Sequence, residues 1–287
     1  MREEHRVGLE YVTTVTTLLQ RVRGANPTAG LYEAADLQWW WRTPRATDEL
    51  AQLFWFDDAG RPEAAAIAVD WAGRVALVPV VMPDASPEVV ALVVDRGLAH
   101  LCASGFDPVD VDTNRADTAL RDVLTDHGFT VEGDEIVETW LGTAARPAIS
   151  RLADGYRLRT RVDTVARPHH LVGRGGPDVE ARLGQTSLYR PDLDLVVVDE
   201  RDDVVAYGLF WFDPVTATGL VEPMRTEDAH RRRGLARHIL TTGVDRLAAA
   251  GATRVKICYE PDNPASGHLY RGVGFEPDRR TVVLSRP

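Results

Sequence analysis

The chain of 287 residues has little cysteine, almost no lysine and no long apolar segment. Its two cysteines, Cys102 and Cys258, lie in apolar segments without the spacing of a disulfide framework or a zinc site, so we expect both in the core of a cytoplasmic protein. No segment is apolar enough to span a bilayer or to serve as a secretory signal, so no membrane partner is expected. Lys256 is the only lysine among 33 basic residues, a bias that we attribute to a GC-rich genome rather than to function.

Acidic side chains outnumber basic ones by 43 to 33, which gives a formal net charge of −10. A nucleic-acid partner is therefore not expected, and amine-bearing substrates are mildly favoured. The length suits two domains of about 140 residues, each able to bury a core.

Residues 230–236 lie between a strand-like run, residues 219–224, and a segment in which Leu235 and Ile239 begin a helical periodicity. A strand-to-helix turn presents unpaired backbone N–H groups and the positive end of the helix dipole. Gly234 lets the backbone approach a bulky anion, and the neighbouring arginines add positive charge. The segment therefore predicts a phosphate or pyrophosphate site.

The spacing of Arg231, Gly234 and Ala236 resembles the pyrophosphate loop of the GNAT acetyltransferase superfamily, which reads Gln/Arg-x-x-Gly-x-Gly/Ala. Residues 263–275 resemble the second signature of that superfamily, Asn-x-x-Ala/Ser-x-x-Leu-Tyr-x-x-x-Gly-Phe. The two signatures occur in the right order and at the right separation. The resemblance implies that the cofactor is acetyl-CoA (coenzyme A).

In this superfamily the strand before the loop splays from its neighbour and pairs with the pantetheine arm, while loop amides hold the pyrophosphate. Asn263 either bonds the pantetheine amides, caps the helix that follows, or does both. No metal is expected. The residues that the resemblance assigns to the cofactor are Met224, Arg225, Thr226, Arg231, Arg232, Arg233, Gly234, Leu235, Ala236, Asn263 and Ser266.

Two residues are candidates for catalysis. Tyr270 stands at the position of the general-acid tyrosine of the superfamily and would protonate the sulfur of CoA; the alternative is that it only packs on Phe275. Glu222, on the strand before the loop, would act as the base with a raised pKa, or it is a structural carboxylate. The backbone N–H of Met224 would stabilise the oxyanion.

The sequence also repeats itself, because Leu-Phe-Trp-Phe-Asp occurs at residues 53–57 and again at 209–213. The predicted fold class is α/β (α+β mixed): two tandem GNAT folds, each a twisted, mostly antiparallel sheet with a splayed strand pair, flanked by helices. We place the domains at residues 1–145 and 146–287. At the position of the loop, the first copy has residues 82–88, which contain acidic side chains and no glycine, so this domain is predicted to be degenerate and to do no chemistry. Its remaining roles would be to shape the substrate cleft or to bind CoA weakly by another route.

Hydrophobic periodicity predicts the elements within each copy, and residues 165–186, broken by glycines and Pro177, are predicted to be helical or irregular. Three adjacent tryptophans, at 39–41, are interpreted as a packing wedge between a helix and a strand. Predicted helices are residues 6–24, 87–104, 118–126, 234–250 and 265–272; predicted strands are residues 53–57, 64–70, 75–81, 109–111, 130–141, 156–162, 193–199, 204–212, 218–224, 254–258 and 281–284.

Other polar residues suggest sites less strongly. His169 and His170 are interpreted as surface or linker residues, because adjacent histidines point apart and no acidic residue is spaced with them. Tyr189 and Asp192 either line the acceptor cleft or form a plain turn. His230 is predicted to be exposed. The acidic residues at 227 and 228 depart from the superfamily pattern and would oppose a bound pyrophosphate.

The leading hypothesis is an acetyl-CoA-dependent N-acetyltransferase for a primary amine of a small polar molecule, such as an amino sugar, an antibiotic or a thiol precursor. One alternative is a protein or peptide N-acetyltransferase, which needs a long open groove. Another is a non-catalytic acyl-CoA-binding regulatory module. The chain is expected to be a monomer or a homodimer.

Overall fold

The computed structural model describes residues 1–71 and 73–286, which form two compact units. The N-terminal unit contains residues 1–37 and 44–136 together with the residues from Arg279 onward. The C-terminal unit contains Gln38–Thr43 and Val137–Asp278. Each unit thus combines one long stretch of the chain with a short segment that is remote in sequence. Within the described residues, no helix is both long and apolar enough to cross a membrane.

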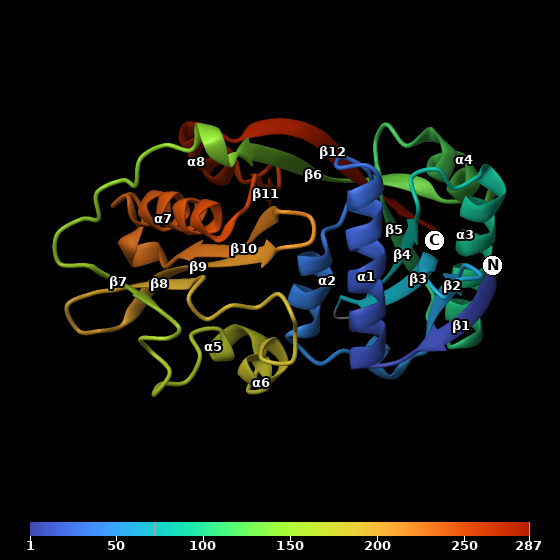
Figure 1. Cartoon of the computed structure of the whole chain (residues 1–287), viewed down its shortest axis with the longest axis horizontal. Coiled ribbons are helices and arrows are strands. Elements are labelled where there is room, and N and C mark those ends of the chain that lie inside the picture. The colour runs from blue at the N-terminus through green and yellow to red at the C-terminus, as the bar shows by residue number, and fades with distance from the viewer. Residues whose placement is uncertain (72, 287) are drawn as a thin grey trace. The chain divides into compact units, whose positions relative to one another are not determined.

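The N-terminal unit is a sheet in the order β1-β2-β3-β4-β5-β12, and α1 and α3 both contact β3 and β4 (Figure 1). Gly97 of α3 packs so closely on Ala66 and Leu77 that a side chain there would clash. The elements are β1 (Arg2–Arg6), α1 (Leu9–Ala25), η1 (Ala46–Glu49), β2 (Gln52–Phe56), β3 (Pro62–Asp70), β4 (Val75–Val81), α3 (Pro87–Ala103), β5 (Val109–Asn114), α4 (Thr118–Asp126) and β12 (Glu276–Ser285). Helix α2 (Ala34–Trp41) begins in this unit and ends in the other.

The C-terminal unit is a sheet in the order β6-β11-β10-β9-β8-β7. Helix α7 lies on one side of β8–β10, and α5 and α6 lie on the other side (Figure 1). The elements are β6 (Thr130–Gly142), η2 (Thr143–Ala145), β7 (Arg157–Thr160), α5 (Val172–Gly175), α6 (Val179–Leu183), β8 (Asp194–Val198), β9 (Val204–Asp213), β10 (Thr218–Thr226), η3 (Asp228–His230), α7 (Leu235–Ala250), β11 (Arg254–Tyr259) and α8 (Pro264–Val273).

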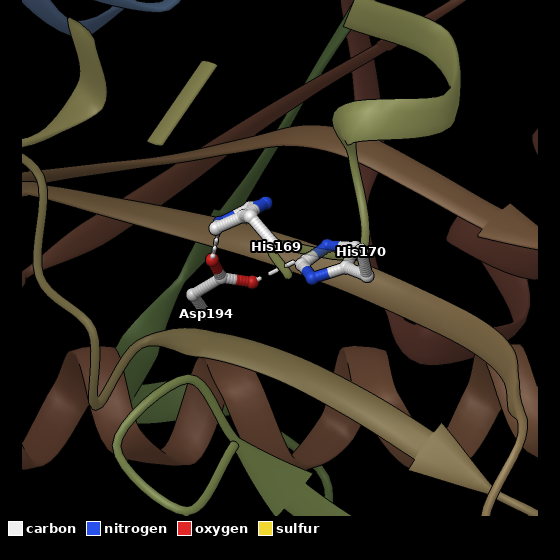
Figure 2. A group of neighbouring side chains, drawn as sticks. All are labelled: His169, His170 and Asp194. Carbon is white, nitrogen blue, oxygen red and sulfur yellow. Dashed lines mark hydrogen bonds and ion pairs between the residues drawn. The ribbon is translucent and has the colours of Figure 1, made fainter. Parts of the chain in front are cut away.

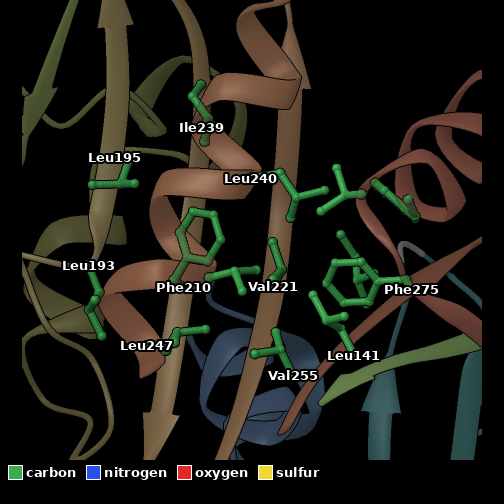
Figure 3. Close-up of a cluster of buried hydrophobic side chains, with 14 of the residues drawn as sticks. Leu141, Leu193, Leu195, Phe210, Val221, Ile239, Leu240, Leu247, Val255 and Phe275 are labelled. Atoms are coloured by element: carbon green, nitrogen blue, oxygen red, sulfur yellow. The ribbon is translucent and has the colours of Figure 1, made fainter. Parts of the chain in front are cut away.

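The core of the C-terminal unit forms where the apolar stripe of α7 meets alternate residues of the sheet (Figure 3). Ile239 and Leu247 of α7 pack on the same cluster as Phe210, which is fully buried. A Cβ atom at Gly243 would lie 2.1 Å from the ring of Phe210, so only glycine fits at this contact. This packing holds α7 and the loop before it against β9 and β10.

One strand pair in each unit is parallel and splays. In the C-terminal unit, β10 pairs with β11 only over residues 218–220 and 254–256, although both strands continue, and β10 carries a β-bulge between Val221 and Met224. In the N-terminal unit, β4 pairs with β5 only through Val75 and Ala76. The predicted splayed pair flanked by helices is confirmed in both units.

The predicted helices and strands are also found, with short helices α5 and α6 in the irregular stretch. The charged strand β1 and the helix α2 were not predicted. The tryptophan wedge is confirmed, because the three indoles are buried and Trp39 packs edge-on against Trp211 of β9 at 6.4 Å between ring centroids. The core interpretation of Cys102 and Cys258 is wrong, since both are exposed. An apolar neighbourhood in the sequence does not decide which face of a helix or strand a small residue occupies.

Candidate functional site

A cavity of about 480 Å³ opens where β10 and β11 separate. Every residue predicted to bind the cofactor lines this cavity except Arg233, and Tyr270 lines it too. The sequence therefore identified residues far apart along the chain that the fold brings together. Over this stretch β10 and β11 do not pair with each other, so an extended ligand can occupy the space between the two strand edges.

The loop before α7 has a backbone conformation that the sequence dictates. Gly234 has φ of 78°, in the left-handed region, and serves as the N-cap of α7. A Cβ atom at this position would meet nothing within 4 Å, so glycine is required for conformation and not for space. The first turn of the 16-residue helix leaves the amides of Leu235, Ala236 and Arg237 without intrahelical acceptors. These amides and the helix dipole favour an anion at the cavity.

Ion pairs offset the acidic residues that the sequence placed near this anion site. Glu227 lies 3.1 Å from Arg174 and 3.3 Å from Arg225. Asp228 lies 2.8 Å from Arg231. Because each carboxylate has a cationic partner, the loop opposes an anion less than its sequence implied.

Helix α8 borders the opposite side of the cavity. The side chain of Asn263 accepts a hydrogen bond from the backbone N–H of Ser266, and Pro264 occupies the first turn. The predicted N-cap role of Asn263 is thus confirmed. Asn263 also lines the cavity, so its predicted contact with the pantetheine amides stays a prediction.

Tyr270, on α8, has an almost completely buried side chain. Its ring packs on Tyr259 and Phe275, with centroids 6.1 and 6.3 Å away. Burial raises the pKa of the Tyr270 hydroxyl to about 12, and the charge of Glu222 contributes to this shift. The hydroxyl is therefore protonated near neutral pH, as a general acid must be. The predicted packing on Phe275 is present as well.

Glu222 is half-buried on β10, at the start of the bulge, and does not line the cavity. Its backbone carbonyl accepts a hydrogen bond of 2.9 Å from the indole nitrogen of Trp211. Trp211 in turn packs against Trp39 and Tyr189. These contacts fix the backbone at the bulge, and the role of the Glu222 carboxylate as base stays a prediction.

Four lining residues were not assigned to the site: His230, Arg237, Ala265 and Leu269. The prediction that His230 is exposed is wrong, because it is half-buried and bonds the hydroxyl of Tyr156 at 2.9 Å. Helical spacing offered a signal for Arg237 and Leu269. Arg237 lies in the first turn of α7, and Leu269 lies three residues after Ser266 on α8, which places Leu269 and Ser266 on the same helix face.

The side chains of His169 and His170 lie beside Asp194 (Figure 2) and are buried, so their interpretation as surface or linker residues is wrong. Their rings stack with centroids 4.5 Å apart, and both face Asp194 of β8. His169 Nε2 lies 2.8 Å from the carboxylate, and Tyr189 donates to the same oxygen at 2.9 Å. Asp192, by contrast, pairs with Arg190 at 2.6 Å on the surface.

Two histidines and an aspartate also suit a divalent cation. However, Nδ1 of His169 accepts a hydrogen bond from the backbone N–H of Leu171 at 3.2 Å. The proton of His169 must then be on Nε2, where it is donated to Asp194 and no lone pair is left for a metal. The geometry therefore favours a hydrogen-bonded network.

Known proteins resemble the C-terminal unit in sequence. Residues 162–275 match the model of the acetyltransferase (GNAT) family. The chain is 30% identical over 163 residues to mycothiol acetyltransferase of Gordonia bronchialis, covering 51% of this chain and 52% of that protein. It is 30% identical over 105 residues to mycothiol acetyltransferase of Kocuria rhizophila, covering 34% of each. The aligned part thus spans about half, or less, of these relatives.

Solved structures share the fold over nearly the whole chain. A tandem GNAT protein from the clavulanic acid biosynthesis pathway superposes with a TM-score of 0.69 at 15% identity, covering 99% of this chain and 97% of its own. A GCN5-related N-acetyltransferase from Sphaerobacter thermophilus gives a TM-score of 0.64 at 16% identity, covering 100% and 96%. At such low sequence identities, these comparisons show only that the fold is shared.

Proposed function

Because residues 162–275 of the C-terminal unit match the model of the acetyltransferase (GNAT) family, we propose that this unit transfers an acetyl group from acetyl-CoA to an amine. The observation that carries the proposal is the cavity between the separated strands, with the amides of the α7 first turn at one end and Tyr270 on its wall. An anionic diphosphate fits the amide end, and an extended pantetheine arm fits the separated strand edges.

The transfer needs a neutral amine, an oriented thioester and a proton for the leaving sulfur. The amine nitrogen forms a bond to the thioester carbon, and the bond from that carbon to sulfur breaks. Glu222 takes the proton of the amine directly or through water, and the hydroxyl of Tyr270 gives a proton to the thiolate. The backbone N–H of Met224 stabilises the oxyanion.

The acceptor is proposed to be the primary amine of a small polar molecule, such as an amino sugar, an antibiotic or a thiol precursor. The name of the two curated relatives, mycothiol acetyltransferase, supports a thiol-bearing small molecule among these. Incubating the chain with acetyl-CoA and a panel of such amines, while following thiol release, identifies the acceptor.

A non-catalytic acyl-CoA-binding module is the second candidate, favoured by the near-complete burial of Tyr270. Calorimetry with CoA separates the outcomes. Uptake of CoA together with amine-dependent thiol release supports the transferase, whereas uptake with no release for any amine supports the module. Absence of CoA uptake contradicts both.

Tyr270→Phe and Glu222→Gln then test the assigned roles. We expect each to lower kcat by about 10²–10⁴-fold, as for general acid–base groups, and to leave CoA affinity within a few-fold. Thr216→Val, a substitution outside the cavity, serves as the control. Unchanged turnover in both variants would remove the mechanism but not the cofactor site.

A further inference from the structure

The N-terminal unit has a cavity of its own at the equivalent place, where β4 and β5 separate. Its volume is about 330 Å³, near the lower end of the roughly 300–1,000 Å³ that small-molecule sites occupy. The walls are mostly apolar, with Leu19 and Val22 from α1 and Pro79 and Val80 from β4. The cavity thus offers a small organic molecule a hydrocarbon surface.

Negative charge dominates the polar part of this cavity. Among the described residues that line it, none is lysine, arginine or histidine, whereas Asp112 and Asp117 are both present. Asp117 already accepts the backbone N–H of Leu120 as the cap of α4. Asp112 accepts a hydrogen bond of 2.8 Å from the hydroxyl of Tyr32, and burial raises the pKa of its carboxyl group. Because burial disfavours the ionised form of the Asp112 carboxyl group, a cation beside it would stabilise the carboxylate.

An acyl-CoA diphosphate does not suit this cavity. The corresponding loop contains Pro83 and Asp84, and α3 begins with Pro87, which lacks an N–H. Cationic side chains line the C-terminal cavity, whereas the described residues that line the N-terminal cavity include none. A diphosphate here would meet two carboxylates and few free amides.

We propose that the N-terminal unit binds a small organic ammonium ion in this cavity, with its charge on Asp112 and its hydrocarbon part against α1 and β4. The carboxylate neutralises the ammonium, and the apolar wall excludes water from the pair, which strengthens their attraction. The hydroxyl of Tyr32 holds the carboxylate in position. The degenerate copy is thereby assigned an amine site that is separate from the transferase cavity.

Calorimetry on the full chain with cyclohexylammonium as the probe tests the proposal, with cyclohexanol and cyclohexanecarboxylate as neutral and anionic controls. We expect the ammonium to bind at least tenfold more tightly than the alcohol, and the carboxylate not to bind. Asp112→Asn should lower the affinity for cyclohexylammonium at least tenfold. Asp84 is an exposed acidic residue outside the lining, and Asp84→Asn should leave this affinity unchanged. Saturating CoA should not compete.

A second variant keeps the test decisive if Asp112→Asn folds poorly. Ala29→Leu fills the cavity from a half-buried loop position and should abolish binding of the ammonium without changing the CoA affinity. Tyr270→Phe, in the other unit, should leave ammonium binding intact. Equal binding of ammonium and alcohol, or ammonium binding that persists in Asp112→Asn and Ala29→Leu, overturns the proposal. So does the absence of ammonium binding to the unsubstituted chain.

Discussion

The ammonium group of Lys256 lies 3.0 Å from the carboxylate of Glu138, and both side chains are almost completely buried in the C-terminal unit. The indole nitrogen of Trp140 donates to the other carboxylate oxygen at 2.7 Å. The only lysine of the chain is therefore one half of an internal ion pair between β11 and β6. Its position in the sequence, between two apolar residues of a strand, gave no indication of this partner.

Lys256→Met removes the ammonium group that pairs with the buried Glu138 carboxylate, so we expect a loss of about 3–5 kcal/mol in the free energy of unfolding. Chemical denaturation measures it. Lys256→Met together with Glu138→Leu removes both charges, and this double variant should regain most of the loss. If the single variant is as stable as the unsubstituted chain, the pair contributes little.

Gly234→Ala tests the loop conformation before α7. The alanine Cβ has open space but must adopt φ near 78°, which costs roughly 1–2 kcal/mol for a residue other than glycine. We expect CoA to bind about tenfold more weakly, as measured by calorimetry. Gly234→Asn should bind better than Gly234→Ala, because asparagine tolerates the left-handed region. The opposite order, or equal CoA affinity in all three proteins, would show that the loop is not the anion site.

The loop before α7 and the Lys256–Glu138 pair show what the sequence could and could not predict. The loop and the cofactor cavity depend on residues that are close in sequence or occur in ordered signatures, so motif and periodicity located them. The Lys256–Glu138 pair depends on register between β11 and β6, which lie more than a hundred positions apart. Such pairings follow from tertiary packing, which periodicity does not encode.

The misinterpreted histidines illustrate a second limit. Adjacent side chains point apart in a strand or helix, but His169 and His170 lie in an irregular segment just before α5. There the backbone allows both rings to stack at 4.5 Å and to face Asp194, a partner 25 residues away along the chain. The inclusion of residues 38–43 in the C-terminal unit depends on tertiary packing, which the sequence pattern does not encode.

Tyr270 should make the chain sensitive to alkaline pH. Its pKa is about 12 in the folded chain and about 10 in an unfolded one, so the unfolded state releases the proton first as pH rises. The contribution of Tyr270 to the free energy of unfolding is therefore fully present below pH 10. It falls by about 3 kcal/mol between pH 10 and pH 12. Urea denaturation across this range measures the loss, which should be smaller in Tyr270→Phe. An equal alkaline loss in that variant would assign the effect to another group.

His170 should produce the opposite dependence at acid pH. Burial lowers the pKa of His170 to about 4, although the negative charge of Asp194 acts to raise it. A histidine in an unfolded chain has a pKa near 6.5. The unfolded state takes up the proton first as pH falls, so the contribution of His170 is present above pH 6.5 and is lost between pH 6.5 and 4. His170→Gln should flatten this part of the stability curve. His5→Gln, at an exposed histidine, should not.

The network around Asp194 also predicts how the chain treats divalent metals. A metal on Nε2 of His169 requires the proton on Nδ1, but the Leu171 N–H already points at Nδ1, so two donors would face each other. His170 and Asp194 alone offer too few ligands for a structural zinc site. We therefore expect no stoichiometric uptake of Zn²⁺, and no visible absorption of Co²⁺ in a thiol- or imidazole-bound geometry, when the chain is titrated at neutral pH. A Co²⁺ spectrum that saturates at one equivalent and disappears in His170→Ala would contradict the assigned tautomer and identify the cluster as a metal site.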